Sequence, residues 1–205
     1  MAYPTVDKPY GLKPVNLIGG QVFAGATRQM EIATTANVGY GTSIFYGDLV
    51  KRVTGGTIEK DTGTTTATPC GVFLGCTFTN SSTGQVQFQQ FYPASTSVAA
   101  GTKIFAYVAD DPDTLFQVAV VSGTTVISGV GIAAIGSNAT LVQNAGSTTT
   151  GNSAVAILDT TATTITLPIR IIDVVRDTET TADNFPEVIV KINATMHQYN
   201  NATGV

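Results

Sequence analysis

The segment from Ile44 to Phe78, IFYGDLVKRVTGGTIEKDTGTTTATPCGVFLGCTF, carries the clearest structural signal in the chain. Apolar and polar residues alternate along it, and Gly and Asp residues stand where the alternation breaks. The segment closes with an apolar run between Gly71 and Gly75. This pattern is typical of antiparallel strands that bury one face and leave the other in water. We therefore predict an all-β fold, an antiparallel β-barrel or β-sandwich with an extended N-terminal arm and little helix.

The composition of the 205-residue chain favours the same fold class. Charged residues make up 12% of the chain and hydrophobic residues 43%, and glycine occurs 21 times. Globular domains usually contain about 25% charged residues. Threonine, which is abundant here, suits a pleated and half-exposed surface. So few charges indicate that other subunits cover much of the surface, although a surface rich in Thr, Asn and Ser can also stay soluble alone.

Charge and hydropathy argue against two classes of partner. The net charge is −4 and the pI is near 4.7, and Lys and Arg form no cluster, so we expect no nucleic acid partner. The N-terminus lacks the basic stretch and apolar run of a signal peptide. No apolar run approaches the roughly 18 to 20 residues of a membrane-spanning helix. We expect a soluble protein made in a cytoplasm, with no membrane partner.

Residues 1–14 are predicted to form the extended arm. They contain three prolines, each of which removes a backbone donor and favours extended geometry in the preceding residue. Tyr3, Tyr10 and Leu12 lie among these prolines. A disordered tail seldom carries such residues, and aromatic and apolar anchors supply much of the energy at interfaces. We predict that the arm straps onto a neighbouring subunit through these three side chains.

The rest of the chain is expected to form a barrel or sandwich core over residues 15–121 and a second β-rich part over residues 122–205. The boundary is placed where the sequence pattern changes. Apolar residues in 128–146 recur with neither the period of a strand nor that of a helix, which suggests a loop with a helical turn. Two hairpins are predicted in the core, one within residues 15–32 and one joining residues 103–109 to 115–121. The polar tail from Gln198 to Val205 is expected to fray.

Residues 85–89, QVQFQ, form one of the cleanest alternating strands in the chain. Its apolar face is predicted to be buried, with Phe88 in the core, and its glutamine face to be exposed. Cys70 and Cys76 lie within or beside another strand. Their spacing fits neither a redox pair nor a zinc site, so we predict buried free thiols.

Three motifs resemble functional sites, and the sequence favours a structural interpretation of each. Residues 129–134, GVGIAA, match the relaxed dinucleotide fingerprint, but they follow a predicted antiparallel hairpin and lack the acidic residue that binds ribose. His197 is the single histidine and so has no histidine partner; we expect it in the solvated tail or at a subunit contact. Asp110, Asp111 and Asp113 surround a proline, which is ordinary turn chemistry. We expect no catalytic residue, cofactor or metal site.

The chain resembles a family of small β-rich virion proteins of tailed bacteriophages, called decoration, cement or head-stabilising proteins. The resemblance rests on three stretches: YGLKPVNLIGGQVFAGATRQMEIA from Tyr10, IFYGDLVKRV with GVFLGCTF, and STTTGNSAVAILD followed by LPIRIIDVV and VIVKINATMHQY. It implies a non-enzymatic β-barrel or sandwich that binds the outside of an icosahedral capsid, often as a homotrimer or homodimer. The implied partner is the major capsid protein, and the implied location is the outer capsid surface of a virion assembled in the host cytoplasm.

Two other interpretations remain open at this point. A phage tail or fibre module, or a head knob that binds host surface glycans, would use the loops as its working surface. An enzyme such as a hydrolase would need a cluster of buried titratable groups lining a pocket.

Overall fold

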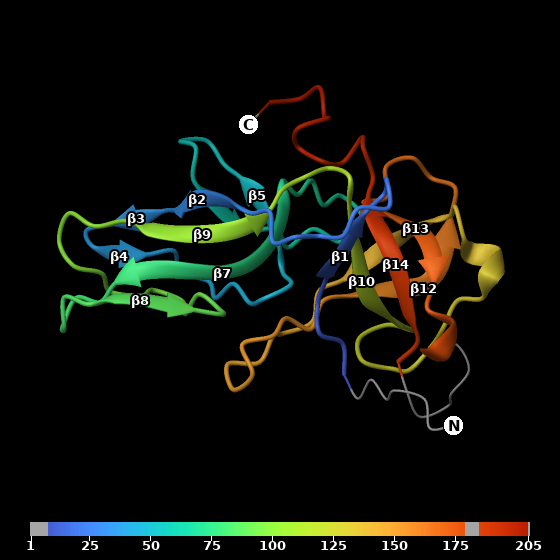
Figure 1. The fold of residues 1–205 in the computed structure, drawn as a ribbon, viewed down its shortest axis with the longest axis horizontal. Helices are drawn as coiled ribbons and strands as arrows, with labels where there is room; N and C mark the ends of the chain where they lie inside the picture. Colours follow the sequence, from blue (N-terminus) through green and yellow to red (C-terminus); the bar gives the residue numbers. More distant parts are fainter. Residues whose placement is uncertain (1–7, 179–184, 205) are drawn as a thin grey trace.

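The structure is a computed structural model that describes residues 8–178 and 185–204 (Figure 1). Almost all regular structure in these residues is β-strand, and the helices η1 (Ile132–Ala134) and η2 (Arg176–Thr178) are short 3-10 turns. The strands form two six-stranded sheets and a small two-stranded ribbon. Each large sheet closes into a barrel, and the two barrels lie side by side along the long axis of the molecule. The predicted all-β fold is confirmed.

The first barrel is built from six strands that lie between Arg28 and Ala109. They are β2 (Arg28–Ile32), β5 (Leu49–Arg52), β6 (Ile58–Lys60), β7 (Gly71–Thr79), β8 (Val86–Gln89) and β9 (Ile104–Ala109). Five of them close a ring in the order β2-β9-β7-β5-β6, and β6 pairs back to β2. β8 stands outside this ring and pairs with the second half of β7. The ribbon of β3 (Thr34–Thr35) and β4 (Val38–Gly39) lies at the end away from the second barrel (Figure 1).

The second barrel combines the end of the arm with the C-terminal half of the chain. Its strands are β1 (Lys13–Leu17), β10 (Thr114–Val121), β11 (Asn138–Val142), β12 (Ala156–Ala162), β13 (Ile169–Val174) and β14 (Glu187–Ile192). The ring order is β10-β14-β13-β11-β12, and β12 pairs back to β10. β1 is the strand outside this ring, and it pairs with β10.

The two barrels have the same topology, although the sequence shows no repeat. If the ring strands are numbered along the chain, both rings run first, fifth, fourth, second, third. In both, the first and third strands are parallel, β2 with β6 and β10 with β12, and the other ring pairs are antiparallel. Each ring also carries one additional strand on its outside, β8 on the fourth ring strand and β1 on the first, so the equivalence holds for the rings. The molecule is therefore a tandem of two equivalent barrels.

Alternate side chains on the ring strands point inward and fill the two barrels. Met30, Ile32, Phe73, Phe78 and Ile104 belong to the core cluster of the first barrel. Complete burial of a side chain of this size stabilises a fold by about 1.5–3 kcal/mol. The alternation seen in the sequence is thus the inside–outside alternation of barrel strands.

The joint between the barrels is also apolar. Leu49, Val72 and Ala109 lie on first-barrel strands, yet they pack in one cluster with Phe116 and Val118 of β10. Because the outer surface of the first barrel is continuous with the second core, the two barrels share buried apolar surface.

The hairpin predicted to join residues 103–109 to 115–121 is wrong, and the one predicted within residues 15–32 forms only in part. β9 and β10 flank a turn of the expected kind, in which Asp111 Oδ1 accepts a hydrogen bond from the Asp113 amide at 2.8 Å. However, the turn passes the chain from one barrel to the other, so β9 pairs with β2 and β7 while β10 pairs with β1, β12 and β14. In the first predicted hairpin, the chain does turn after β1, and Asn16 forms an antiparallel bridge with Val22. However, β2 does not pair with β1 and belongs to the other barrel. The strands of the second barrel thus begin before residue 122, at β10, and include β1.

The irregular stretch at residues 128–146 contains the expected helical turn, η1, and also a strand, β11. The alternation of apolar and polar residues in β11 is hard to see in the sequence, because the strand contains small residues and its register with β12 shifts between Ala139 and Leu141.

Candidate interaction surface

The predicted arm anchors have separate environments. Tyr3 lies outside the described residues. Leu12 is completely buried in the joint, where its amide donates to the Gly47 carbonyl at 3.0 Å. The hydroxyl of Tyr10 donates to the Glu187 carboxylate, and the Lys13 ammonium lies 4.0 Å from the centre of the Tyr10 ring. Leu12 and Tyr10 are thus used within the chain, and neither enters the contact surface described below.

Burial raises the pKa of Tyr10 far above its ordinary value, and the adjacent carboxylate of Glu187 raises it further. The Tyr10 hydroxyl therefore remains a hydrogen-bond donor throughout the physiological pH range. Its contact with Glu187 fixes the end of the arm to β14.

A charged network is buried at the joint. Asp48 Oδ2 lies 2.8 Å from the Lys60 Nζ atom and accepts a hydrogen bond from the Phe45 amide at 2.8 Å. Asp48 Oδ1 accepts a second bond at 2.6 Å from the hydroxyl of Ser153, which precedes β12 of the other barrel. All three partners come from this chain and Asp48 is completely buried, so the network cross-links the two barrels.

The C-terminal tail is held against the first barrel rather than frayed at Gln198 and Tyr199, which corrects the prediction. The Gln198 side chain accepts a bond from the Arg52 amide at 2.7 Å and donates to the Arg52 carbonyl at 3.1 Å. The Tyr199 hydroxyl donates to Asp110 at 2.6 Å, and Arg28 forms an ion pair with the same carboxylate at 2.7 Å.

His197 is buried within the chain, so both predicted environments, a solvated tail and a subunit contact, are wrong. Burial lowers its pKa, and the nearby charges of Asp110 and Asp111 oppose this shift. Its Nδ1 atom accepts a hydrogen bond from the Tyr199 amide at 3.3 Å. The tail that carries His197 packs against a barrel because its neighbours Gln198 and Tyr199 find partners there.

Cys70 and Cys76 are buried and unpaired with each other, as predicted. Burial raises the pKa of each thiol to about 12. Both groups are therefore protonated at neutral pH and act as small apolar side chains in the first core.

The outer face of β8, β7 and β9 is the most distinctive surface of the molecule. Phe88 on β8 and Phe105 on β9 both pair with Thr77 of β7, so the three side chains form a row across one face of the sheet. Val86 pairs with Thr79 in the next row. The exposed fractions are 73% for Phe88, 63% for Val86 and 37% for Phe105. We call Val86, Phe88 and Phe105, with Thr77 and Thr79 between them, the β8 face.

The exposure of Phe88 overturns the prediction that it lies in the core. Because β8 stands outside the ring, its alternation is not set by the interior of the barrel. Its register instead pairs Gln87 and Gln89 with the inward-facing Phe78 and Cys76, and this leaves Val86 and Phe88 on the outside. Sequence alternation detected the two faces of β8 correctly but assigned them to the wrong sides.

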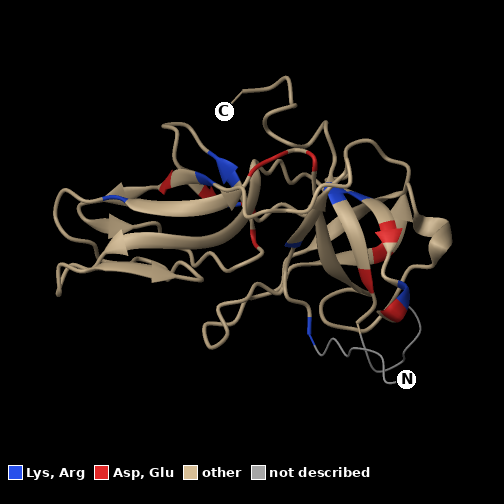
Figure 2. Ribbon diagram, in the orientation of Figure 1, with Lys and Arg blue, Asp and Glu red and all other residues tan. Residues whose placement is uncertain are grey.

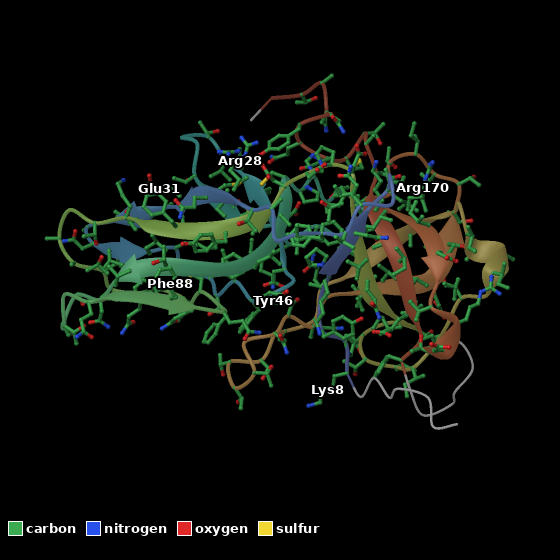
Figure 3. All side chains as sticks on the ribbon, in the orientation of Figure 1. Lys8, Arg28, Glu31, Tyr46, Phe88 and Arg170 are labelled. Carbon is green, nitrogen blue, oxygen red and sulfur yellow. The ribbon has the colours of Figure 1, made fainter. Side chains whose placement is uncertain are left out.

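Except for Phe105, the residues of the β8 face lie in a part of the chain without charges. No Asp, Glu, Lys or Arg occurs between Asp61 and Lys103. Figure 2 accordingly shows the ribbon of β7 and β8 without any charged segment. The nearest charges are Glu31 and Lys103, which form an ion pair at 2.6 Å. Glu31 on β2 is the strand partner of Phe105, at the border of the β8 face, and Figure 3 labels it together with Phe88 on β8. The face is therefore apolar, uncharged and bordered by a neutralised pair.

A groove of about 950 Å³ lies between the arm and the loop that precedes β12. Tyr10 and Phe185 contribute rings to its wall, and Asn144 and Asn152 contribute amide groups. These amides are partly occupied, because Asn144 donates to the Thr124 carbonyl and Asn152 accepts from Gln90. Within the described residues, no group of three or more His, Cys, Asp or Glu side chains is placed to hold a metal ion.

Comparisons with protein-family models, with curated proteins and with solved structures find no match. In residues 8–178 and 185–204, no helix has the length and hydropathy needed to cross a membrane.

Proposed function

We propose that this protein is a structural virion protein that binds the outer surface of an icosahedral phage capsid and stabilises it. The observation that carries the proposal is the β8 face, where large apolar side chains are exposed in an uncharged region. The resemblance of the sequence to capsid decoration proteins supports the same role. The partner would be the major capsid protein, and the role requires no catalytic step.

The physical argument is the cost of leaving this face in water. Burial of apolar surface contributes about 25 cal/mol per Å², and Val86 and Phe88 expose most of their side-chain surface. Fully desolvated aromatic side chains at the centre of an interface often dominate its binding energy. Desolvation of a charged group opposes binding. β7 and β8, which carry Val86, Phe88 and the threonines between them, contain no charged residue, so docking on these two strands avoids that cost.

The decisive experiment is binding to capsids prepared without this protein, with occupancy measured by cryo-EM. We expect the wild-type chain to fill regular positions on the shell and Phe88→Ser to lower its occupancy at equal concentration. Ile165→Ser is the matched control, because it removes a similarly exposed apolar side chain from the second barrel. Absence of wild-type binding to the shell would refute the proposed function. Equal occupancy of the two variants would refute the assignment of the β8 face.

The groove supports a second candidate, a tail or head-knob module that binds host glycans. Rings and amides in one open groove suit the apolar faces and hydroxyls of a sugar. This candidate predicts glycan-array binding that Asn144→Ala weakens, together with location of the protein on the tail or head knob in labelled virions. Binding of the chain to bare capsids through Phe88, without any glycan signal, would count against it.

A further inference from the structure

We propose that two copies of this chain pair through β8, edge to edge and antiparallel, about a two-fold axis at Gln87. The inference goes beyond capsid binding and does not depend on it. It rests on which residues of β8 direct their main-chain N–H and C=O groups away from β7 and on the side chains that these residues carry. It also rests on the absence from β8 of the charges, prolines and bulges that prevent edge pairing.

The outer edge of β8 carries free main-chain groups. The Asn80 amide donates to the Gln85 carbonyl at 2.9 Å, and this bond sets the phase of the pairing between β7 and β8. In an antiparallel pair, hydrogen-bonding groups alternate between the two sides of the strand. Gln87 and Gln89 therefore direct their amides and carbonyls to β7, whereas Val86 and Phe88 direct theirs outward. Among the described residues, no strand or isolated bridge pairs with this outer edge.

These outward groups are self-complementary. With the axis at Gln87, Val86 of one copy faces Phe88 of the other, and each such pair can exchange two N–H···O bonds. The side chains of these pairs meet on the β8 face as aromatic and β-branched neighbours, a combination that contributes roughly 0.2–1 kcal/mol per pair. No charge lies on the strand, so two identical copies meet without repulsion.

The additional strand of the second barrel has features that protect a sheet edge, although the two additional strands are attached at different places, β1 to the first ring strand β10 and β8 to the fourth ring strand β7. β1 is also the additional strand outside a ring, but it contains Lys13 and Pro14 and has a bulge between Pro14 and Asn16. Lysine, proline and bulges are the usual devices that prevent pairing at sheet edges. β8, VQFQ, has a continuous register and neither a charge nor a proline. The outer side of β1 is also covered by the chain itself, since Asn16 forms an antiparallel bridge with Val22. Of the two additional strands, β8 alone is open to a second copy.

This pairing would join two first barrels through a continuous sheet. It also selects between the oligomers expected for this chain, because a two-fold, self-complementary edge closes with two copies and produces a dimer rather than a trimer. The two β8 faces would then lie on one side of the joined sheet, so that a dimer presents one larger continuous apolar surface to a partner.

Disulfide trapping tests the pairing and its register. Gln87→Cys places two thiols across the axis in a non-hydrogen-bonded pair, where the Cα atoms are about 4.5 Å apart, within the range of roughly 4.4–6.8 Å for disulfides. Ser82→Cys is the control, because Ser82 is exposed in the preceding turn and well away from the axis. We expect mild oxidation to convert most of the Gln87→Cys protein, and little of the Ser82→Cys protein, to a covalent dimer. Mass spectrometry of the Gln87→Cys dimer should show the two peptides that carry the substitution linked to each other.

Sedimentation velocity over a concentration series gives the second readout. Val86→Pro removes an outward amide without removing a bond to β7, and proline is tolerated at such edge positions. Val86→Thr keeps the amide and serves as its control. We expect Val86→Thr to dimerise as the wild type does and Val86→Pro to remain monomeric with an unchanged far-UV spectrum. A wild-type chain that stays monomeric, together with equal trapping of the two cysteine variants, would overturn the proposal whether or not capsids bind.

Discussion

Substitution of Lys60 by Met is expected to cost a large part of the stability of the protein. Lys60 lies 2.8 Å from Asp48, and the exposed fractions of the two side chains are 11% and 0%. Lys60→Met keeps most of the aliphatic length and leaves a buried carboxylate with two neutral donors, the Phe45 amide and the Ser153 hydroxyl. Removal of one partner of a buried ion pair typically costs about 3–5 kcal/mol. Whole domains are stable by only about 5–15 kcal/mol.

The assay is urea denaturation followed by far-UV circular dichroism, with Lys51→Met as the control. Lys51 and Glu59 form an ion pair on the same two strands at 3.3 Å, but their exposed fractions are 34% and 31%. Exposed pairs of this kind contribute about 0–1 kcal/mol. We also expect Asp48→Asn to recover part of the loss in the Lys60→Met background, because it removes the unpaired charge. If Lys60→Met and Lys51→Met cost the same, the joint does not depend on this ion pair and the reasoning is wrong.

Three further predictions concern other parts of the joint and the cores. Gly11 and Gly20 both have a φ of +82°, but a Cβ atom at Gly11 would lie 2.7 Å from a backbone oxygen, whereas Gly20 has open space. Gly20→Ala should lower the free energy of unfolding by about 1–2 kcal/mol. Gly11→Ala should lower it by roughly 1–3 kcal/mol more, as measured by calorimetry. Because burial lowers the pKa of His197, the unfolded state binds its proton more readily, so stability should fall as pH drops below 6.5, and a His197→Gln variant should lose less over that range in urea titrations. Cys70 and Cys76, with pKa values raised to about 12, should react with a thiol reagent at pH 8 only as fast as the protein unfolds, and rapid labelling of the folded protein would contradict their burial.

Local features of the sequence predicted the fold class, the turn at Asp110–Asp113 and the buried thiols. These features depend on residues close together in the chain, because alternation, turn chemistry and cysteine spacing are local patterns. The β8 face could not be assigned in this way. Alternation shows that Val86 and Phe88 share a face, but the same pattern results when that face points into a core or away from it.

Strand partners were decided by the tertiary structure. The segments before and after Asp110–Asp113 look like the arms of a hairpin, and the turn has hairpin chemistry. They separate because each arm finds more extensive pairing in its own barrel, β9 with β2 and β7, and β10 with β1, β12 and β14. Several distant strands of similar apolar character could pair with each of these segments. Closure of a whole ring selects the partners, and local sequence patterns contain no information about ring closure.

The order of residues along the chain thus determined most of the strand segments, β11 excepted, and where the chain turns, since backbone preference and side-chain alternation act over a few residues. The closure of two equivalent rings decided which strands pair, which side of β8 faces water, and that Leu12, Asp48 and His197 become buried. These outcomes depend on contacts between residues far apart in sequence, such as Asp48 with Ser153. Their energies exist only once both barrels have formed.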